Sequence, residues 1–355
     1  MAHVPGRRRR GAEAPGTPGR EDAEVSGGED AEAPGREDAE ALAGSARAAL
    51  VREIGLTGVW EADPVWREAF AAVPRHLFVP SYTTGLGGRD TRSGRDPDPA
   101  ARARWVRGAY EDVPLATRVR DGELVSSSSQ PSLMALMLVA LDVRDGDRVL
   151  EIGAGTGYNA ALIAHRLGDD DLVTTVDLEP EITASARRNL AAAGHHPLVV
   201  TGDGALGVPE RAPFDRIIAT CALPSVPRAW LAQCRPGGRI LTPLATGLVR
   251  LTVHDAGHAE GRFLPTAAYF VPLRGAGRSA PERTGCGGVP RRVREDDLFR
   301  FLLDLGSGGL DPQEAYALWQ REGAPGRERY GITVRGDRSW AWLDDPEGPY
   351  AWPFT

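Results

Sequence analysis

The run Val-Leu-Glu-Ile-Gly-Ala-Gly-Thr-Gly-Tyr at residues 149–158 decides the fold class of this chain. Its apolar start is typical of a central strand in a parallel sheet. Gly153, Gly155 and Gly157 then allow a tight turn that a ligand can approach closely. A helix is expected directly after the turn, over residues 159–167. A strand, a glycine turn and a helix in this order predict a site for a nucleoside.

The residue before the glycines indicates which nucleoside. The G-x-G-x-G pattern is close to the G-x-G-x-x-G turn that holds the pyrophosphate of a dinucleotide, but it lacks the third glycine spacing. Glu151 precedes the glycines, and its carboxylate would repel a pyrophosphate and attract an ammonium group. This pattern favours S-adenosylmethionine, a cationic sulfonium compound, over NAD. An oxidoreductase is the weaker alternative, since the sequence offers no candidate for handling a hydride.

Three further apolar segments follow, at residues 172–176, 198–200 and 214–220. Asp177 ends the first of them, about 20 residues beyond the glycines, where an acid can accept hydrogen bonds from both ribose hydroxyls. Asp203 follows the second and could accept from the adenine amino group. Ligands of open α/β sheets bind outside the carboxyl ends of the strands. We therefore expect an α/β, doubly wound Rossmann-like core, with N-terminal helices and a small C-terminal α+β module.

At these motifs the chain resembles the protein-L-isoaspartate O-methyltransferase family, over residues 73–274. The resemblance implies a class I methyltransferase core that transfers the methyl group of S-adenosylmethionine to a carboxylate of a damaged aspartyl residue. Two departures are Ser128, where the family has an apolar residue, and Cys-Ala-Leu-Pro at 221–224, where it has an Ala-Ala-Pro-Pro type. The resemblance rests on residues 73–80, 127–131, 149–158, 202–204, 212–215, 236–238 and 271–273.

The resemblance also implies the site residues. Without it, four serines at a helix start would indicate helix capping, by Ser129 or Gln130. With it, Ser129 matches the active-site hydroxyl, which would hold an acceptor carboxylate in line with the methyl group. A carboxylate is ionised at pH 7, so we expect direct displacement without a general base. No metal is expected. The implied cofactor residues are Ser127, Ser128, Gln130, Glu151, Gly153, Ala154, Gly155, Thr156, Gly157, Asp177, Leu178, Asp203, Gly204 and Thr220.

Composition limits the partners. The 355 residues carry a net charge of −7, which disfavours nucleic acid, and all the basic residues are Arg. Cys221, Cys234 and Cys286 form no C-x-x-C pair, so a zinc site or disulfide framework is not indicated and a reducing cytoplasm is expected. Cys221 is expected to be a buried or cavity-lining thiol. The longest apolar run, 133–141, is too short to cross a membrane.

The sequence divides into four parts. Residues 1–42 are rich in Gly, Pro, Ala and Glu and predict a disordered tail. The methyltransferase domain is expected over 43–275, with Ser45 as a helix N-cap and a loop from Gly85 to Arg104. A linker at 276–295 precedes a C-terminal substrate-recognition or accessory module, 296–355. In this module we expect helices from Asp297 and Asp311, then a hairpin of 332–334 with 339–343.

The C-terminal module bears on the acceptor, because ordinary repair enzymes of the family are expected to lack it. Together with 263–265 and 271–274 it resembles the branch found with ribosomal-peptide biosynthesis. Members of this branch methylate an aspartate of a cyclised precursor peptide, of the graspetide or lanthipeptide kind, and the ester closes to a succinimide. One alternative is a repair enzyme that acts on isoaspartyl-containing polypeptides. Another is a non-catalytic subunit that binds S-adenosylmethionine or a leader peptide. The sequence does not set the oligomeric state.

Overall fold

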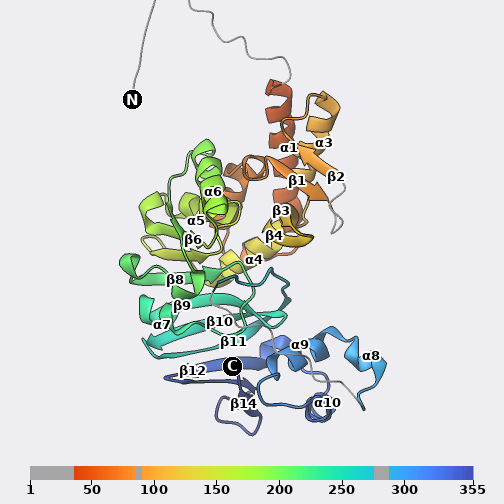
Figure 1. Cartoon of the computed structure of the whole chain (residues 1–355), viewed down its shortest axis with the longest axis vertical. Coiled ribbons are helices and arrows are strands. Elements are labelled where there is room, and N and C mark those ends of the chain that lie inside the picture. The colour runs from red at the N-terminus through yellow and green to blue at the C-terminus, as the bar shows by residue number, and fades with distance from the viewer. Residues whose placement is uncertain (1–35, 85–89, 276–287, 355) are drawn as a thin grey trace, which may run out of the picture.

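A computed structural model describes residues 36–84, 90–275 and 288–354, and its core is a ten-stranded sheet (Figure 1). The parallel half of this sheet has the order β7-β6-β5-β8-β9. β5, which carries the start of the glycine run, is buried along its whole length between β6 and β8. The chain order reverses beside β5, and this is where such sheets bind ligands. The elements here are β5 (Val149–Ile152), α5 (Tyr158–Leu167), η3 (Asp170–Leu172), β6 (Val173–Asp177), α6 (Pro180–Ala192), β7 (Leu198–Thr201), η4 (Gly204–Leu206), η5 (Pro209–Arg211), β8 (Phe214–Ala219), α7 (Arg228–Gln233) and β9 (Cys234–Leu244).

The second half of the sheet is antiparallel and runs on into the C-terminal module. β11 pairs with β12, so strands that are far apart in the sequence are neighbours. The expected hairpin is confirmed as β12 and β13, and both expected helices form. Phe299 and Phe301 of α9 belong to the same apolar cluster as Ile152 of β5. The elements are β10 (Gly247–Asp255), β11 (His258–Ala267), α8 (Arg291–Arg294), α9 (Asp297–Leu305), α10 (Pro312–Arg321), η6 (Arg327–Arg329), β12 (Tyr330–Arg335), β13 (Arg338–Leu343) and β14 (Ala351–Pro353).

Two of the expected parts of the chain lie largely outside the described residues. These are the expected tail, of which residues 1–35 are not described, and the expected linker, of which residues 276–287 are not described. The first helix begins at Arg36 rather than near Ser45, whose hydroxyl donates to Ala41 O within the helix. Residues 36–42 are therefore helical, and α8 lies within the expected linker.

The N-terminal part adds helices and a small sheet of order β2-β1-β3-β4. The prediction of a loop from Gly85 to Arg104 is wrong for its described residues, because β2 and the start of α3 lie there. Asp98 caps α3 by accepting from the backbone N–H groups of Ala100 and Ala101, with Pro99 in the first turn. The elements are α1 (Arg36–Gly55), η1 (Val59–Glu61), α2 (Val65–Ala72), η2 (Arg75–Phe78), β1 (Ser81–Thr84), β2 (Asp90–Ser93), α3 (Pro99–Ala109), β3 (Leu115–Arg120), β4 (Glu123–Ser128) and α4 (Pro131–Leu141).

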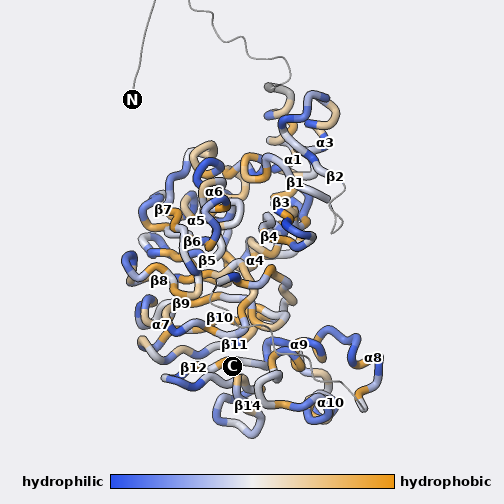
Figure 2. Tube along the Cα trace, in the orientation of Figure 1, coloured by the Kyte–Doolittle hydropathy of each residue, from blue (hydrophilic) through white to orange (hydrophobic). Residues whose placement is uncertain are grey.

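Hydrophobic residues concentrate in the interior of this arrangement. Figure 2 shows them along α4 and the central strands, while α8 and α10 at the surface are largely hydrophilic. α4 buries Met134, Ala135, Met137, Leu138 and Leu141. Among the described helices, none combines the length and the apolar character that a membrane crossing requires.

Candidate active site

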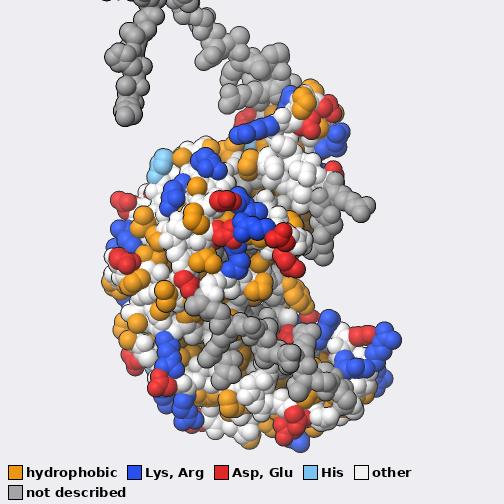
Figure 3. All heavy atoms as spheres, viewed as in Figure 1, with side chains coloured by type: hydrophobic (Ala, Val, Ile, Leu, Met, Phe, Trp, Pro, Cys, Tyr) orange, Lys and Arg blue, Asp and Glu red, His pale blue; other side chains and the backbone are white. Residues whose placement is uncertain are grey.

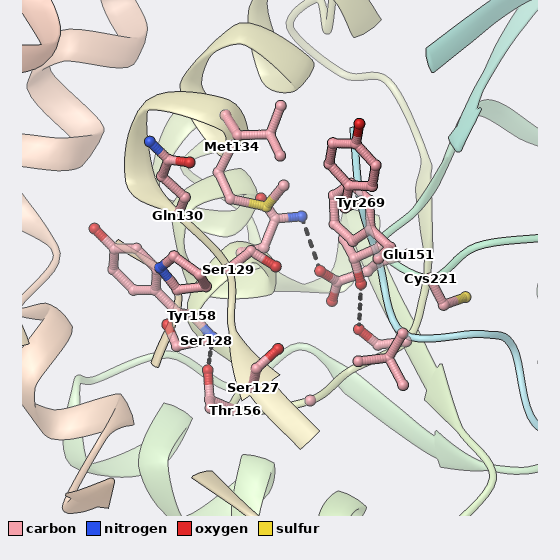
Figure 4. Close-up of a pocket in the computed structure, with 18 of the residues that line it drawn as sticks. Ser127, Ser128, Ser129, Gln130, Met134, Glu151, Thr156, Tyr158, Cys221 and Tyr269 are labelled. Atoms are coloured by element: carbon pink, nitrogen blue, oxygen red, sulfur yellow. Dashed lines mark hydrogen bonds between the residues drawn. The ribbon is translucent and has the colours of Figure 1, made fainter. Parts of the chain in front are cut away.

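A cavity of about 1050 Å³ lies at the carboxyl ends of β5, β6 and β8. Figure 4 shows Ser127, Ser128 and Ser129 along one side of it, and Glu151, Cys221 and Tyr269 along the other. Of the predicted residues, Gly157 and Asp203 are not among the described residues that line it. All the others line it: Ser127, Ser128, Ser129, Gln130, Glu151, Gly153, Ala154, Gly155, Thr156, Asp177, Leu178, Gly204 and Thr220.

The glycine turn needs glycine at each of its three positions. Gly153, Gly155 and Gly157 have φ of 96°, 50° and 88°, in the left-handed region that other residues rarely adopt. A Cβ on Gly153 would lie 2.8 Å from Thr220 Oγ1, the hydroxyl that donates to Gly153 O. Gly157 packs against Leu190 of α6 instead of facing the cavity. The backbone of Gly153 and Gly155 therefore lines the cavity directly, whereas Gly157 packs against the neighbouring helix.

Glu151 is a buried carboxylate at the cavity wall, with 1% of its surface exposed. Its Oε1 accepts from Asn159 Nδ2 at 2.8 Å and its Oε2 from Thr175 Oγ1 at 2.6 Å. Burial raises the pKa of Glu151 to about 7, the charge of Asp177 adds to this rise, and the two hydrogen bonds partly offset it. An ammonium group placed nearby would favour the ionised form.

Asp177 ends β6 and points at the glycine turn, where its Oδ2 accepts from Gly155 N at 3.1 Å. Sequence reasoning missed Arg274, whose Nη2 lies 3.6 Å from Asp177 Oδ1 and whose Nη1 pairs with Glu179. Leu273, beside it, packs closely on Gly204. The segment around Arg274 thus closes the cavity over the ends of β6 and β7. Asp203 lies behind this segment and caps η4 by accepting from Ala205 N.

The serine run precedes α4, and Gln130 stands at the N-cap position of this helix as expected, but its side chain caps no backbone N–H group. Asp112 does so instead: its Oδ1 accepts from Ser132 N at 2.8 Å and its Oδ2 from Gln130 Nε2 at 3.2 Å. The buried Arg75 holds the run by donating to Ser129 O at 3.1 Å. Ser128 Oγ is buried and has no hydrogen-bond partner within the described part of the chain. The serines therefore sit at the cavity without serving as caps.

Cys221 and His76 are two further titratable side chains, and both have structural explanations. Burial raises the pKa of Cys221 to about 12, so this cavity-lining thiol is protonated at neutral pH. His76 is buried, its Nδ1 lies 2.8 Å from Tyr110 Oη, and burial lowers its pKa. Neither group is placed as a nucleophile or general base. Within the described residues, no group of three or more His, Cys, Asp or Glu is arranged to hold a metal ion.

Sequence reasoning also missed Asn159, Thr175 and Tyr269. The first two belong to α5 and β6 and bind the carboxylate of Glu151. They could be inferred only as partners that a buried acid requires. Tyr269 has no local pattern that marks it, because its contacts are formed by residues distant in the sequence.

The residues present fit S-adenosylmethionine. The glycine turn leaves room that a Cβ would fill, and acids stand at the ends of β5 and β6. Ser128 Oγ and Asn159 Oδ1 are buried and have no partner among the described residues, so each can bond with a ligand. The doubly wound core and this site define a class I methyltransferase, with S-adenosyl-L-methionine as its cofactor.

Comparisons with known proteins identify the family. Residues 100–276 match the sequence model of Protein-L-isoaspartate(D-aspartate) O-methyltransferase. Protein-L-isoaspartate O-methyltransferase 1 of Archaeoglobus fulgidus is 36% identical over 208 residues, 58% of this chain and 84% of the relative. The enzyme of the same name from Anaeromyxobacter sp. is 36% identical over 239 residues, 65% of this chain and 97% of the relative. The chain belongs to the protein-L-isoaspartate O-methyltransferase family.

A solved structure bears on the expectation that repair enzymes of the family lack the C-terminal module. A protein-L-isoaspartate O-methyltransferase matches with a TM-score of 0.58 and 25% identity, and the match covers 84% of this chain and all of that one. Residues 1–275 make up less than four fifths of this chain. A match of this coverage must therefore extend beyond residue 275. The length of the chain after the methyltransferase core does not by itself indicate the peptide-biosynthesis branch.

Proposed function

We propose that this enzyme esterifies an aspartate side chain of a cyclised precursor peptide, of the graspetide or lanthipeptide kind. The carboxyl methylation itself follows from the family. The observation that supports a bulky peptide acceptor is the extent of the cavity. At about 1050 Å³ it slightly exceeds the range of about 300–1,000 Å³ typical of sites for one small ligand. Beyond the serines it continues along α4, lined by Leu133, Leu136 and Val139.

In this reaction the residues of the cavity would have separate roles in binding the cofactor and in positioning the acceptor. Asp177 would accept hydrogen bonds from the ribose hydroxyls, Glu151 would hold the ammonium group, and Gly204 would lie at the adenine end. Asp203, expected at this end too, does not line the cavity and caps η4 instead. When bound, S-adenosylmethionine supplies an electrophilic methyl group on a sulfonium sulfur. Ser129 donates a hydrogen bond to the acceptor carboxylate and holds it for attack. No residue has to remove a proton, because the carboxylate is ionised at neutral pH.

Esterification explains a later step that needs no further catalyst. A methyl ester is a better electrophile than a carboxylate, and the next backbone nitrogen is held close to it. Attack of this nitrogen on the ester carbonyl forms a succinimide and releases methanol. Residues 296–355 would act in this scheme as the substrate-recognition module, and the reaction would take place in the cytoplasm.

Repair of isoaspartyl-containing polypeptides is the second candidate. It is favoured by the match to a solved structure named only as a protein-L-isoaspartate O-methyltransferase, which covers 84% of this chain and all of that one. Both candidates use the same cofactor residues and differ in the acceptor alone.

The test is mass spectrometry of two acceptors, each incubated with the enzyme and S-adenosylmethionine. One is an isoaspartyl test peptide and the other is a cyclised precursor peptide from the same gene cluster. Gain of a methyl group and then loss of methanol on the cyclised peptide alone is the result we expect. Methylation of the isoaspartyl peptide alone would replace this proposal by repair. Methylation of neither would contradict both candidates.

A further inference from the structure

Tyr269 is an aromatic side chain at the mouth of the cavity. It lines the cavity and yet has 67% of its surface exposed. In Figure 4 its ring lies across the cavity from Ser129 and Met134. It belongs to the segment that leads from β11 to Arg274 and so forms part of the cavity wall. An exposed ring of this kind at a site mouth is free to contact a second ligand beside the cofactor.

The hydroxyl of Tyr269 is held by the C-terminal module. It donates to Asp297 Oδ1, on the first residue of α9. Asp297 Oδ2 in turn accepts from Arg327 Nη2 at 2.7 Å. α9 belongs to the arm that also carries α8 (Figure 1), and Figure 3 shows the molecule hollowed between this arm and the N-terminal elements.

Arg327 makes this connection rigid. It is 3% exposed, and its Nε donates to Thr246 O at 3.2 Å in the turn between β9 and β10. Its guanidinium also lies 5.0 Å from the ring centre of Phe301, on the buried side of α9. Asp297 therefore links the Tyr269 hydroxyl to a buried cation. The charge of Arg327 is balanced by Asp297, which is the partner that a buried guanidinium requires.

A ring that is fixed before binding loses little conformational entropy when a partner packs against it, and tyrosine combines a large apolar face with few rotatable bonds. The acids assigned to the cofactor, Glu151 and Asp177, lie at the carboxyl ends of β5 and β6, whereas Tyr269 comes from the segment after β11. The face of Tyr269 is thus left for the acceptor.

We propose that Tyr269 is a specificity-determining residue whose ring packs against the peptide segment next to the acceptor carboxylate, and that the C-terminal module contributes by holding this ring through Asp297 and Arg327. The inference rests on the proposed function only in requiring a peptide acceptor. It applies to the cyclised and to the isoaspartyl peptide alike.

The test compares three single variants, and the double variant Tyr269→Phe with Asp297→Asn, with wild type, using whichever peptide the wild type methylates. Tyr269→Ala removes the ring, Tyr269→Phe removes only the hydroxyl, and Asp297→Asn weakens the acceptor of that hydroxyl. Tyr350→Phe is the matched control, since it removes a hydroxyl of the same module that bonds to Arg321. Acceptor KM, kcat and the Kd for S-adenosylhomocysteine are measured for each, with thermal unfolding to confirm folding.

We expect Tyr269→Ala to raise the acceptor KM about tenfold and to leave the Kd for S-adenosylhomocysteine within about twofold. Tyr269→Phe and Asp297→Asn should each raise KM about threefold, and the double variant no further, because both remove one interaction. Tyr350→Phe should match wild type. An unchanged KM in Tyr269→Ala, or an equal loss of S-adenosylhomocysteine binding, would overturn this inference alone. A wild type that methylates neither peptide would overturn it together with the proposed function.

Discussion

The two sides of the cavity are built in different ways. The cofactor side comes from one stretch of successive strands and helices, β5 to β8, in which each strand end adds a residue. The acceptor side comes from η1, the serine run, α4, the end of β11 and, through Asp297, the C-terminal module. The cofactor side is therefore a local property of the sequence, whereas the acceptor side exists only in the folded molecule. The predictions below separate the two sides, beginning with the largest effect.

Gly153→Val should abolish cofactor binding. Its Cβ would lie 2.8 Å from Thr220 Oγ1, and φ of 96° strains any residue with a side chain, by about 1–3 kcal/mol. Calorimetry with S-adenosylhomocysteine should detect no binding. Gly146→Ala is the control, since φ there is 80° but a Cβ would meet no described atom within 4 Å. It should cost some stability and leave binding intact. Measurable binding by Gly153→Val would contradict the assigned cofactor turn.

Ser129→Ala should lower turnover and spare the cofactor. A hydrogen bond to a charged group contributes about 1.5–3 kcal/mol, so kcat should fall about tenfold to hundredfold. The Kd for S-adenosylhomocysteine should not change. Ser307→Ala, at an exposed serine after α9, serves as the control and should keep wild-type kcat. Wild-type turnover in Ser129→Ala would place the acceptor elsewhere.

Glu151 should make cofactor binding depend on pH. Its pKa is raised to about 7, and an ammonium group favours the ionised form. Below about pH 7 binding must release a proton, and affinity should fall by up to about tenfold per pH unit. Above this pH it should level off. Titrations with S-adenosylhomocysteine in buffers of different ionisation enthalpy measure the proton release directly, and Glu151→Gln should eliminate it.

The raised pKa of Glu151 has the opposite effect on the stability of the unliganded protein, which should decrease as pH rises. The folded-state pKa of Glu151 lies above its ordinary value of 4.5, so the folded state binds more protons between these two pH values. The contribution of this group is therefore full below about pH 4.5 and is lost as pH rises to about 7. Comparison of the free energy of unfolding of wild type and Glu151→Gln across this range checks the sign. If the wild type became more stable relative to Glu151→Gln as pH rises from about 4.5 to about 7, the expected sign would be wrong.

Asp112→Ala should have the smallest effect of these variants, and this effect should be mainly on the free energy of unfolding. It removes the cap of α4 and the anchor of Gln130, which costs about 1 kcal/mol of unfolding free energy. Since Asp112 supports the serine run, kcat should fall modestly while the Kd for S-adenosylhomocysteine stays constant. Asp98→Ala removes the comparable cap of α3 and should reduce stability without changing kcat. Equal kcat in both variants would show that the acceptor side does not depend on this cap.

What could be predicted follows the same division. The strand, the glycine turn and the acids Glu151 and Asp177 could be predicted because hydrophobic periodicity, glycine and strand-end acids are local signals. The same signal misled at Asp203, which follows β7 but caps η4 and does not line the cavity. The cap of α4 could not be predicted, because Asp112 is 20 residues away from the N–H group it accepts from. Arg274 and Tyr269 were missed for the same reason. The loop prediction at 85–104 failed because Arg and Asp content outweighed the Asp98-Pro99 helix start, which is a local signal.

The way in which the large sheet ends has a consequence for solubility. β14 is its outermost strand on the C-terminal side; it is three residues long and ends in Pro353, which has no N–H group to offer another chain. Removing residues 351–354 would leave β13, with Trp340 and Trp342, as the open edge. Removing the module after residue 287 would expose the longer β11. Shortened proteins of either kind should therefore associate edge to edge and aggregate. The last strand thus prevents the sheet from pairing with other copies of the chain.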